Sequence, residues 1–574
     1  MSPQRLKLLL VSMIVVFCAL SARLYYLQVW NHAFYQRHAR NQYVRYKNVR
    51  SLRGNILDRR GRVLSFSTFA DSCYADPFLI RRPRMTAEQI APYVGETPAE
   101  IAEKLSTAHG RFVWIKRRMG ATESDAVRKL DLPGIGFIQE EKRLYPYGNL
   151  AGHVIGMLGD DNQPLSGIEF SAAELLSGKR ITTKTRRDAL GKEICLEAGT
   201  VNEQTCNVKT TIDRTIQYFA EAELERAMEE TQAERGIVIV QDPHTGEILA
   251  MALSPMLELS GTCSTVGDLK NYAVSGIWEP GSTFKIVPVA ALLQEKMVTS
   301  TDRFDCENGE FDVMDRTIHD HTEHGMLTVS EIVEQSSNIG MAKLGGLLGK
   351  EKMYYYTRAF GFGAYSGISL AGEQRGIFRQ SKYWSGVSLY MLSFGQEIGV
   401  TPLQLIGAYS AIANGGYLVK PWIIKEIIDH EKRNMCVTEK TVVRKVLDQH
   451  VVEKLKDMLC NTVDNGTGML AQVESFSVCG KTGTAQQIDK ETREYSTEKY
   501  FASFCGFLPK ENPRVCILVC LDAPKGVYWG GVVAAPVFAR IAARTIAYLN
   551  VPPDRNQEPI SPQPTQYAQS KNIN

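Results

Sequence analysis

The chain of 574 residues lacks a strong charge of either sign and has only one long apolar run. Its 66 Lys and Arg residues nearly balance 63 Asp and Glu residues, which leaves a net charge of +3. No basic stripe interleaved with aromatic residues is present, so nucleic acid is not an expected partner. No Cys-x-x-Cys and no internal repeat occur, which argues against a zinc knuckle, a dithiol redox motif and a repeat architecture. The length predicts two or three domains.

The single long apolar run lies near the N-terminus. Arg5 and Lys7 precede it, and its apolar and aromatic character continues to position 30. A positive flank, an apolar core and an aromatic end predict a membrane anchor at 8–30, with a cytoplasmic tail at 1–7 and the bulk of the chain outside the cytoplasm. A cleaved signal peptide is the alternative, because Ala19-Leu20-Ser21 resembles a cleavage site.

Twelve cysteines are many for a chain expected outside the cytoplasm. Cysteine in an apolar, strand-like run is usually a small buried hydrophobic residue. Four cysteines fit that interpretation: Cys479, Cys505, Cys516 and Cys520. Cys195 and Cys206 are close enough in sequence to pair, but spacing alone assigns no disulfide.

The pattern of elements predicts two folded domains after the anchor. Residues 31–210 begin with a segment at 31–50 expected to be helical, continue with a charged hairpin at 53–64, and form the N-terminal domain. Residues 211–550 have strands at both ends and helices between them, which favours an α+β domain around one antiparallel sheet. Residues 551–574 are rich in Pro, Gln, Asn and Ser and are expected to be disordered. The strands expected in the second domain are 236–241, 247–253, 473–479, 500–506 and 514–521, and its first and last helices are 215–234 and 535–549.

Three polar clusters follow one another in the second domain. Ser282-Thr283-Phe284-Lys285 follows a Pro-Gly turn and is expected to open a buried helix, with serine and lysine one turn apart. Alone it fits a helix cap and a surface lysine equally well. Ser336-Ser337-Asn338 comes after a short helix expected at 327–335, and Lys481-Thr482-Gly483-Thr484 ends the strand expected at 473–479. The order Ser-x-x-Lys, Ser-x-Asn, Lys-Thr-Gly is a strong signal, closely related to the motif sets of penicillin-binding proteins and class A β-lactamases.

These clusters contain the groups that acyl transfer through a serine requires. Ser282 would attack a carbonyl and form an acyl-enzyme. Lys285 would take its proton if burial and the nearby Lys481 keep it neutral. Ser336 could pass a proton to the leaving amine, and Asn338 could orient Lys285 and hold a substrate amide.

The third cluster supplies groups for substrate binding. Lys481 and the two threonines could bind a substrate carboxylate, and a glycine would let substrate lie along the strand edge. The residues assigned to substrate binding are Ser337, Thr482, Gly483 and Thr484. The backbone N–H groups of Ser282 and Thr484 would form the oxyanion hole.

Other motif interpretations fail on single residues. Ser475 stands where a phosphate-binding loop before Lys481 needs a glycine, and Phe284 stands where a Gly-x-Ser-x-Gly elbow needs one. His319, His321 and His324 could form a metal site, but no companion ligands accompany them, so surface histidines are the preferred interpretation. We therefore expect no metal and no cofactor.

The motifs and their surroundings resemble a class B penicillin-binding protein, a monofunctional peptidoglycan D,D-transpeptidase. The resemblance covers nearly the whole chain. Segments 500–509 and 528–538 are most similar to the cell-division branch. Further segments that carry the resemblance are Arg53-Gly54…Asp58-Arg59, Arg143-Leu144-Tyr145-Pro146, Gly167-Ile168-Glu169, Asp188…Gly191 and Gly395…Thr401-Pro402-Leu403.

The resemblance implies a transpeptidase domain of the penicillin-binding-protein/β-lactamase type, an antiparallel sheet flanked by helices, on an N-terminal pedestal (dimerisation-type) domain. It implies a donor stem peptide ending in D-Ala-D-Ala, an acceptor amine from lipid II-derived strands, and acylation by β-lactams. It also implies a single pass through the inner membrane, a periplasmic catalytic domain, and a polytopic glycosyltransferase and other divisome proteins as partners.

Alternative functions are an elongation-type or sporulation-type transpeptidase, and a D,D-carboxypeptidase or β-lactamase-like hydrolase in which water resolves the acyl-enzyme. A β-lactam sensor or a catalytically silent scaffold is a further class. The pedestal argues against a small hydrolase, and the intact clusters argue against silence. The short N-terminal tail expected at 1–7 leaves no room for a sensor's signalling module.

Overall fold

The computed structural model describes residues 3–555 apart from short gaps, and the chain divides into two units. The gaps are 51, 108, 178–179, 188–192, 196–204, 261–264, 266, 430, 432 and 489–493, and the side chains of 39–50, 180–187 and 193–195 are also left undescribed. One unit comprises 1–53 and 177–206, and the other comprises 54–176 and 207–574. The turn near Asp188, the Cys195–Cys206 pairing and most of the expected tail lie outside the described residues.

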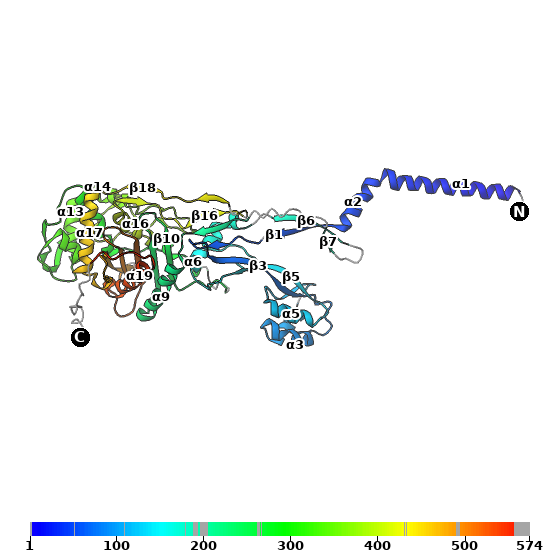
Figure 1. Cartoon of the computed structure of the whole chain (residues 1–574), viewed down its shortest axis with the longest axis horizontal. Coiled ribbons are helices and arrows are strands. Elements are labelled where there is room, and N and C mark those ends of the chain that lie inside the picture. Colours follow the sequence, from blue (N-terminus) through cyan, green and yellow to red (C-terminus); the bar gives the residue numbers. More distant parts are fainter. Residues whose placement is uncertain are drawn as a thin grey trace. The chain divides into compact units, whose positions relative to one another are not determined.

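The first unit begins with the apolar N-terminal helix (Figure 1). Helix α1 spans Pro3–Tyr25, and a wider turn at Tyr26–Trp30 extends it. This stretch is long and apolar enough to cross a membrane, and none of it is buried. Helix α2 spans His32–Tyr43, so the helix expected at 31–50 is wrong beyond Tyr43. There β1 (Val44–Arg50) pairs with β6 (Arg180–Arg187), which in turn pairs with β7 (Glu193–Cys195), because a partner far along the chain outweighs local propensity.

The pedestal part of the second unit is built on a mixed sheet that continues into the C-terminal half of the chain. The strand order is β17-β16-β8-β2-β3-β4, and β5 also pairs with β3. Because β8 ends at Thr210 and pairs with β16, hydrogen bonds cross the boundary predicted after residue 210. These strands are β2 (Ile56–Leu57), β3 (Val63–Ala75), β4 (Val113–Lys116), β5 (Ile135–Leu144), β8 (Asn207–Thr210), β16 (Ile424–Ile428) and β17 (Asn434–Val437).

Strands β3 and β5 run side by side toward a small helical group (Figure 1). The group consists of α3 (Pro83–Val94), α4 (Pro98–Thr107) and α5 (Ala121–Lys129). Its own apolar cluster includes Ile90, Ile101 and Val127, one from each helix. Residues 83–129 therefore form a small helical group with an apolar core of its own.

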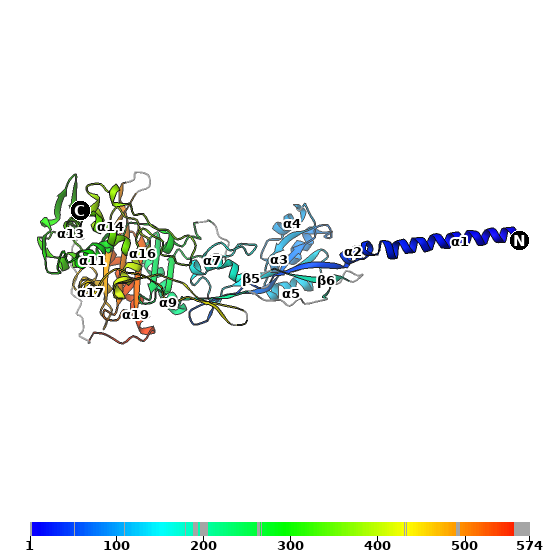
Figure 2. The ribbon, with the colours of Figure 1, turned by 90° about the horizontal axis from the view of Figure 1, so that it is seen from above.

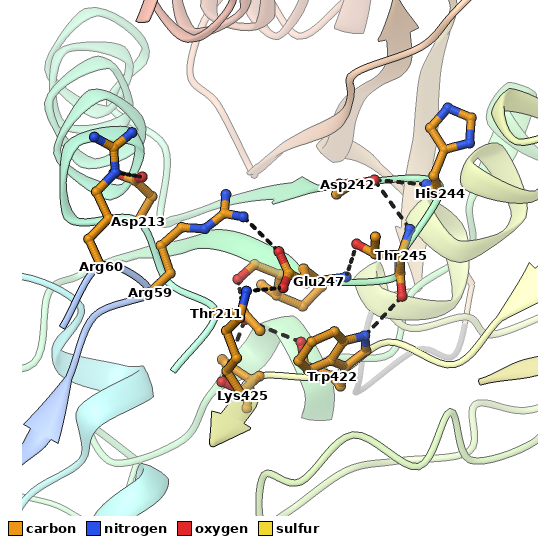
Figure 3. Close-up of polar contacts among 12 residues, drawn as sticks. Arg59, Arg60, Thr211, Asp213, Asp242, His244, Thr245, Glu247, Trp422 and Lys425 are labelled. Carbon is orange, nitrogen blue, oxygen red and sulfur yellow. Dashed lines mark hydrogen bonds and ion pairs between the residues drawn. The ribbon is translucent and has the colours of Figure 1, made fainter. Parts of the chain in front are cut away.

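The charged hairpin predicted at 53–64 joins the two parts of this unit (Figure 3). Asp58 is fully buried and accepts hydrogen bonds from the backbone N–H and the guanidinium of Arg62. Arg59 and Lys425 both bind the carboxylate of Glu247, at 2.9 and 2.8 Å. Oppositely charged side chains from distant segments thus hold the hairpin against the catalytic part.

The catalytic part is organised around one antiparallel sheet of order β10-β9-β21-β20-β19. The strands are β9 (Arg235–Gln241), β10 (Ile248–Ser254), β19 (Cys479–Ile488), β20 (Tyr495–Leu508) and β21 (Val515–Asp522). Four of the five expected strands are confirmed. The strand expected at 473–479 is wrong, because β19 starts only at Cys479 and contains the Lys-Thr-Gly motif within it.

Helices cover both faces of this sheet (Figure 2). On one face α9 (Arg214–Thr231) and α19 (Ala535–Tyr548) share an apolar core with alternate residues of β9 such as Val238. On the other face β9 contributes residues such as Ile239 to a larger core with the helical lobe. The main helices of that lobe are α11 (Ile286–Gln294), α12 (Val329–Glu334), α13 (Asn338–Leu348), α16 (Pro402–Ala413) and α17 (Gln449–Asp464).

The remaining elements are short or lie at the margins of these layers. They are α6 (Gly152–Ile155), α7 (Gly167–Ser171), α8 (Ala173–Leu176), α10 (Tyr272–Ser275), α14 (Lys350–Ala359), α15 (Ser388–Ser393), α18 (Gly530–Val533), β11 (Arg303–Asp305), β12 (Glu310–Val313), β13 (Arg316–His319), β14 (Met326–Thr328), β15 (Tyr417–Val419) and β18 (Val442–Lys445). The segment Gly530–Tyr548 is also long and apolar enough to span a membrane, but half of it is buried in the core.

A disulfide links the helical lobe to the first residue of β19. Cys479 pairs with Cys460 on α17. Cys479 is buried as expected, but it is paired, because the fold brings a second cysteine beside it, and no sequence pattern assigned such a disulfide. Cys505, Cys516 and Cys520 are buried in the sheet as expected.

Candidate active site

Ser282 lies on a 3-10 turn, η2 (Gly281–Lys285), which continues into α11. Gly281 has φ +54° and donates its N–H to the carbonyl of Gly395 at 3.2 Å, an approach so close that a side chain on Gly395 would collide with the Gly281 carbonyl. The buried hydroxyl of Tyr409 donates to the carbonyl of Thr283 at 2.9 Å. Ser282 itself stays partly exposed while the three residues after it are buried, so its hydroxyl faces out of a rigid support.

Lys285 is fully buried against the Ser-x-Asn cluster. Its Nζ donates to the carbonyl of Ser336 at 2.5 Å, to Asn338 Oδ1 at 2.8 Å and to Ser336 Oγ at 3.2 Å. Burial lowers the pKa of Lys285 to about 7, and the negative charge of Asp320 opposes that shift. A large fraction of Lys285 is therefore neutral near pH 7 and able to accept a proton.

Ser336 occupies a constrained turn between α12 and α13. Its φ of +62° lies in the left-handed region, which non-glycine residues adopt at an energetic cost and mostly at functional sites. Ser337, expected to bind substrate, is buried instead. Its hydroxyl caps α13 by accepting from the N–H of Gly340 at 2.9 Å, and it donates to Asp320 at 2.5 Å. Its hydrogen-bonding capacity is thus used inside the protein.

Asp320 holds the Ser-x-Asn turn in place, and the sequence patterns did not point to it. It follows β13, and its carboxylate accepts from the hydroxyl of Ser337, from the N–H of Asn338 and from the N–H of Ile339. The side-chain amide of Asn338 also donates to the carbonyl of His319 at 3.0 Å. Asp320 and Asn338 are far enough apart in sequence that only the fold brings them together. The sequence itself showed no more than an acidic residue in a histidine-containing loop.

Lys481 is also fully buried, on β19, the last strand of the sheet among the described residues. Its Nζ lies 3.2 Å from Thr482 Oγ1 and 3.5 Å from Thr467 Oγ1, and the two threonine hydroxyls lie 2.8 Å apart. Burial, and then the nearby Lys285, hold the pKa of Lys481 well below its usual range. Thr467 belongs to a Gly-Thr-Gly segment that follows α17, and no motif recognised in the sequence included it.

The next two residues of β19 tie the strand to its neighbours. A Cβ on Gly483 would lie 2.5 Å from Ser503 Oγ and 2.8 Å from Thr283 Cγ2, so glycine is required for η2 to pack on the strand. The sequence predicted a different role for this glycine, which was to leave the strand edge open for substrate. Thr484 Oγ1 accepts from the N–H of Gly530 at 3.0 Å.

An aromatic contact connects the two sides of the site. His321, which follows Asp320, packs edge-on against Trp529, with ring centroids 4.7 Å apart. Trp529 precedes the glycine bound to Thr484, so the contact spans from the Ser-x-Asn side to the Lys-Thr-Gly side. The interpretation of all three histidines as plain surface residues is therefore incomplete for His321, although His319 is exposed.

The groups around Ser282 together have the geometry of a serine acyltransferase. A partly exposed serine, a buried lysine with a lowered pKa and a sheet-edge strand with hydroxyl groups are the components of acyl transfer through a serine with a lysine base.

Comparison with known proteins places the chain within this class. Residues 236–543 match the penicillin-binding protein transpeptidase domain, and residues 48–210 match the penicillin-binding protein dimerisation domain. The chain belongs to the class B penicillin-binding proteins, the peptidoglycan D,D-transpeptidases.

Several individual proteins are similar over most of the chain. Stage V sporulation protein D of Bacillus subtilis is 32% identical, over 96% of this chain and 87% of that protein. Peptidoglycan D,D-transpeptidase FtsI of Escherichia coli K12 is 30% identical, over 89% of this chain and 86% of that protein. The crystal structure of penicillin-binding protein 3 from Mycobacterium tuberculosis in complex with aztreonam has a TM-score of 0.69 and 27% identity, and covers 90% of this chain and 100% of that one.

Proposed function

We propose that the chain crosslinks peptidoglycan stem peptides through an acyl-enzyme on Ser282, formed from a donor that ends in D-Ala-D-Ala. Family membership supports the reaction class. The observation that carries the assignment of residues is the buried Lys285, whose Nζ bonds Ser336 and Asn338 one helical turn after Ser282. β-Lactams would acylate the same serine, as the solved complexes of a related protein suggest.

In the acylation step, the hydroxyl oxygen of Ser282 attacks the carbonyl of the penultimate D-Ala and its proton passes to neutral Lys285. The C–N bond then breaks, and the terminal D-Ala leaves as an amine. Its nitrogen receives the proton from Lys285 by way of the hydroxyl of Ser336, which lies 3.2 Å from Nζ. Asn338 accepts from Lys285 and holds the ammonium group during this exchange.

Substrate binding is assigned to β19. The terminal carboxylate of the donor would bind Lys481 and the hydroxyls of Thr482 and Thr484, and its charge would favour the protonated form of Lys481. The backbone N–H groups of Ser282 and Thr484 would stabilise the oxyanion, a contribution of roughly 3–4 kcal/mol per donor. The donor peptide would lie along β19, because alternate N–H and C=O groups of an edge strand have no partner in the sheet.

In the second step, an amine of a neighbouring stem attacks the acyl carbonyl and the ester C–O bond to Ser282 breaks. The proton lost by the amine passes to Lys285, which returns a proton to the hydroxyl of Ser282. The rival is a hydrolase in which water attacks. The dimerisation-domain match at residues 48–210 favours the crosslinking reaction, because a small hydrolase has no need of such a domain.

A labelling and turnover experiment tests this assignment. The purified protein should react covalently with fluorescent penicillin, and Ser282→Ala should not. Incubation with a stem-peptide donor and an amine acceptor should then yield crosslinked product. Persistent labelling of Ser282→Ala would refute the nucleophile, and rapid hydrolysis without crosslinks would favour the carboxypeptidase.

We further propose the cellular setting of this reaction. Residues 8–30 would anchor the chain in the inner membrane, with a pedestal at 31–210 and the transpeptidase domain at 211–550 in the periplasm. A septal role is supported by similarity to FtsI, and a sporulation role by similarity to the sporulation protein. A polytopic glycosyltransferase is the proposed partner in the membrane. A fluorescent fusion in the native host should collect at the division site, and an even distribution along the cell would contradict the septal role.

A further inference from the structure

A cavity of about 810 Å³ lies beside the catalytic strand, at the end of β19 that follows the Lys-Thr-Gly motif. Trp278 and Glu279, from the segment just before η2, form part of its lining. Residues 485–487 continue β19 along another part, and Phe501 of β20 stacks on Trp278 with ring centroids 4.1 Å apart. The cavity therefore borders both the segment that carries Ser282 and the strand along which we expect the donor peptide to lie.

Most charged side chains that line this cavity are paired with a neighbour in the lining. The pairs are Glu234 with Lys499 at 2.6 Å, Arg235 with Asp522 at 3.6 Å, and Arg379 with Glu397 at 3.5 Å. Glu279 is the one acidic lining residue for which the described part of the chain supplies no ion pair. The lining as a whole thus lacks one positive charge.

The carboxyl group of Glu279 has unused hydrogen-bonding capacity as well. Its Oε1 accepts from the N–H of Glu397 at 2.8 Å and from the hydroxyl of Tyr495 at 3.2 Å. Its Oε2 is shielded from solvent and has no hydrogen-bond partner, and the same holds for the indole N–H of Trp278. Because a buried acceptor without a partner is costly, these groups indicate a site completed by a ligand.

We propose that this cavity binds the side-chain ammonium group of the donor stem peptide, with Glu279 as its counter-ion. This proposal rests on the proposed transpeptidase function. A peptide paired with β19 advances about 3.3 Å per residue, so the donor residues before the scissile bond pass along positions 485–487. An ammonium ion supplies the missing positive charge and a donor for Oε2, and the ring of Trp278 favours a cation nearby.

Burial raises the pKa of Glu279 to about 7, with the charge of Glu397 adding to the shift. A bound ammonium group favours the ionised carboxylate, so binding and loss of that proton support each other. The terminal carboxylate of the donor goes to Lys481 at the opposite end of the motif. The two charged ends of the peptide would therefore be bound on either side of Ser282.

The test compares two donors that differ in one group. Wild-type enzyme in excess receives a pentapeptide donor with its side-chain amine free, or the same donor with that amine acetylated, and D-Ala release is followed over a single turnover, so that only the acylation step is measured. We expect kcat/KM to be at least about tenfold higher for the free amine, the size of effect that a hydrogen bond to a charged group provides. Equal values in the wild type would overturn the proposal.

Substitutions test whether Glu279 is the source of the preference for the donor with a free amine. Glu279→Gln should reduce the ratio of the two kcat/KM values to near one, whereas Glu279→Asp should retain part of it. Glu234→Gln is the matched control, since it removes one negative charge from the same lining but from a residue already paired with Lys499. A ratio that survives in Glu279→Gln, or is lost equally in Glu234→Gln, would refute the site. Should Glu279→Gln not fold, the wild-type comparison still decides.

Two further measurements separate this site from the reaction itself. Peptide binding to Ser282→Ala, with free and acetylated amines, reports the preference even if no donor is turned over. If binding shows the preference and no D-Ala is released, the proposed reaction fails and the site stands. If Ser282→Ala binds the free and the acetylated donor equally well, the donor assignment is overturned.

Discussion

Two regions of this chain bury ionisable side chains, and they differ in whether those side chains have an ion-pair partner. At the pedestal, Arg143 and Glu169 have side chains only 4% and 0% exposed and meet at 2.7 Å. At the junction in Figure 3, Glu247 is bound by two cations. In the active site, Lys285 and Lys481 are equally buried, yet neither has an ion pair within the part of the chain that the structure describes.

This difference separates a structural role from a chemical one. A buried charge with a close partner stays charged, because losing its proton or its partner leaves the other charge unpaired. A buried lysine without a carboxylate partner has a lowered pKa and can exchange protons near neutral pH. Lys285 is in the second situation. Glu279 is its acidic counterpart, with a pKa raised to about 7 beside an empty hydrogen-bonding position.

The largest expected effect comes from removing the base. Lys285→Ala should reduce the rate of acylation by penicillin by about 10²–10⁴-fold, the usual contribution of a general base, while the melting temperature does not fall. The matched control is Lys456→Ala, which removes another buried lysine, on α17, and should leave acylation unchanged. Stopped-flow labelling and thermal unfolding measure both. Near-normal acylation by Lys285→Ala would show that Lys285 is not the base, and that the unpaired buried lysine differs from the paired charges of the pedestal in no chemical role.

The next largest effect is expected at the pedestal, and it should fall on stability. Arg143→Ala leaves Glu169 as an unpaired buried charge, so the free energy of unfolding should fall by about 3–5 kcal/mol. Penicillin acylation of the fraction that remains folded should keep its normal rate. The double variant Arg143→Ala/Glu169→Ala should lose less stability than the sum of the single variants. A strictly additive cycle would mean that this pair is not coupled.

The sequence patterns were sufficient to place the groups of the active site that lie within one motif. Ser282 and Lys285 are one turn apart, and the apolar residues that follow predict a buried helix. The partners of Lys285 were also foreseen, because Ser-x-Asn and Lys-Thr-Gly motifs occur in a recognisable order. The burial of Lys285 was expected from the chemistry that a lysine base requires.

Contacts between segments far apart in sequence were not predictable in this way. Asp320 reaches the Ser-x-Asn turn only because two short hairpins and α13 pack together, and Thr467 reaches Lys481 only through the turn before β19. Cys460 and Cys479 meet because α17 packs on β19, which no spacing rule indicates. The start of β19 was misplaced for a related reason. Residues 473–478 mix apolar and polar side chains as a half-buried strand does, but they have no neighbouring strand to pair with among the described residues.

A smaller effect is expected from Asp320, and its sign is distinctive. With Lys285 as the proposed base, acylation requires its neutral form, so the rate should rise with pH through about 7 and fall about tenfold per unit below it. Because the charge of Asp320 raises the pKa of Lys285, Asp320→Asn should move this acidic limb to lower pH. The plateau rate should also fall, because the turn at Asn338 loses a carboxylate clamp.

The pH–rate profile distinguishes this role from a purely structural one. If Asp320 only stabilised the fold, Asp320→Asn would lower the melting temperature without moving the acidic limb. The apparent pKa belongs to the coupled pair of Lys285 and Lys481, so the same profile measured for Lys481→Met shows how much of it reflects their mutual repulsion. If the acidic limb of the pH–rate profile does not move in Asp320→Asn, Asp320 does not influence the pKa of Lys285.

The smallest expected effect defines the lower limit of the comparison. Arg226 and Glu230 form an ion pair at 2.7 Å on α9, with side chains 58% and 49% exposed. Water and salt screen such a pair, so Arg226→Ala should cause no measurable shift in melting temperature or acylation rate. Its distance equals that of Arg143 and Glu169, but it is exposed and joins two residues of one helix, whereas Arg143 is buried and also donates to the carbonyl of Gly54. If Arg226→Ala were as destabilising as Arg143→Ala, contact distance rather than burial would determine what an ion pair contributes. Burial alone would then no longer explain why the pKa values of Lys285 and Lys481 are lowered.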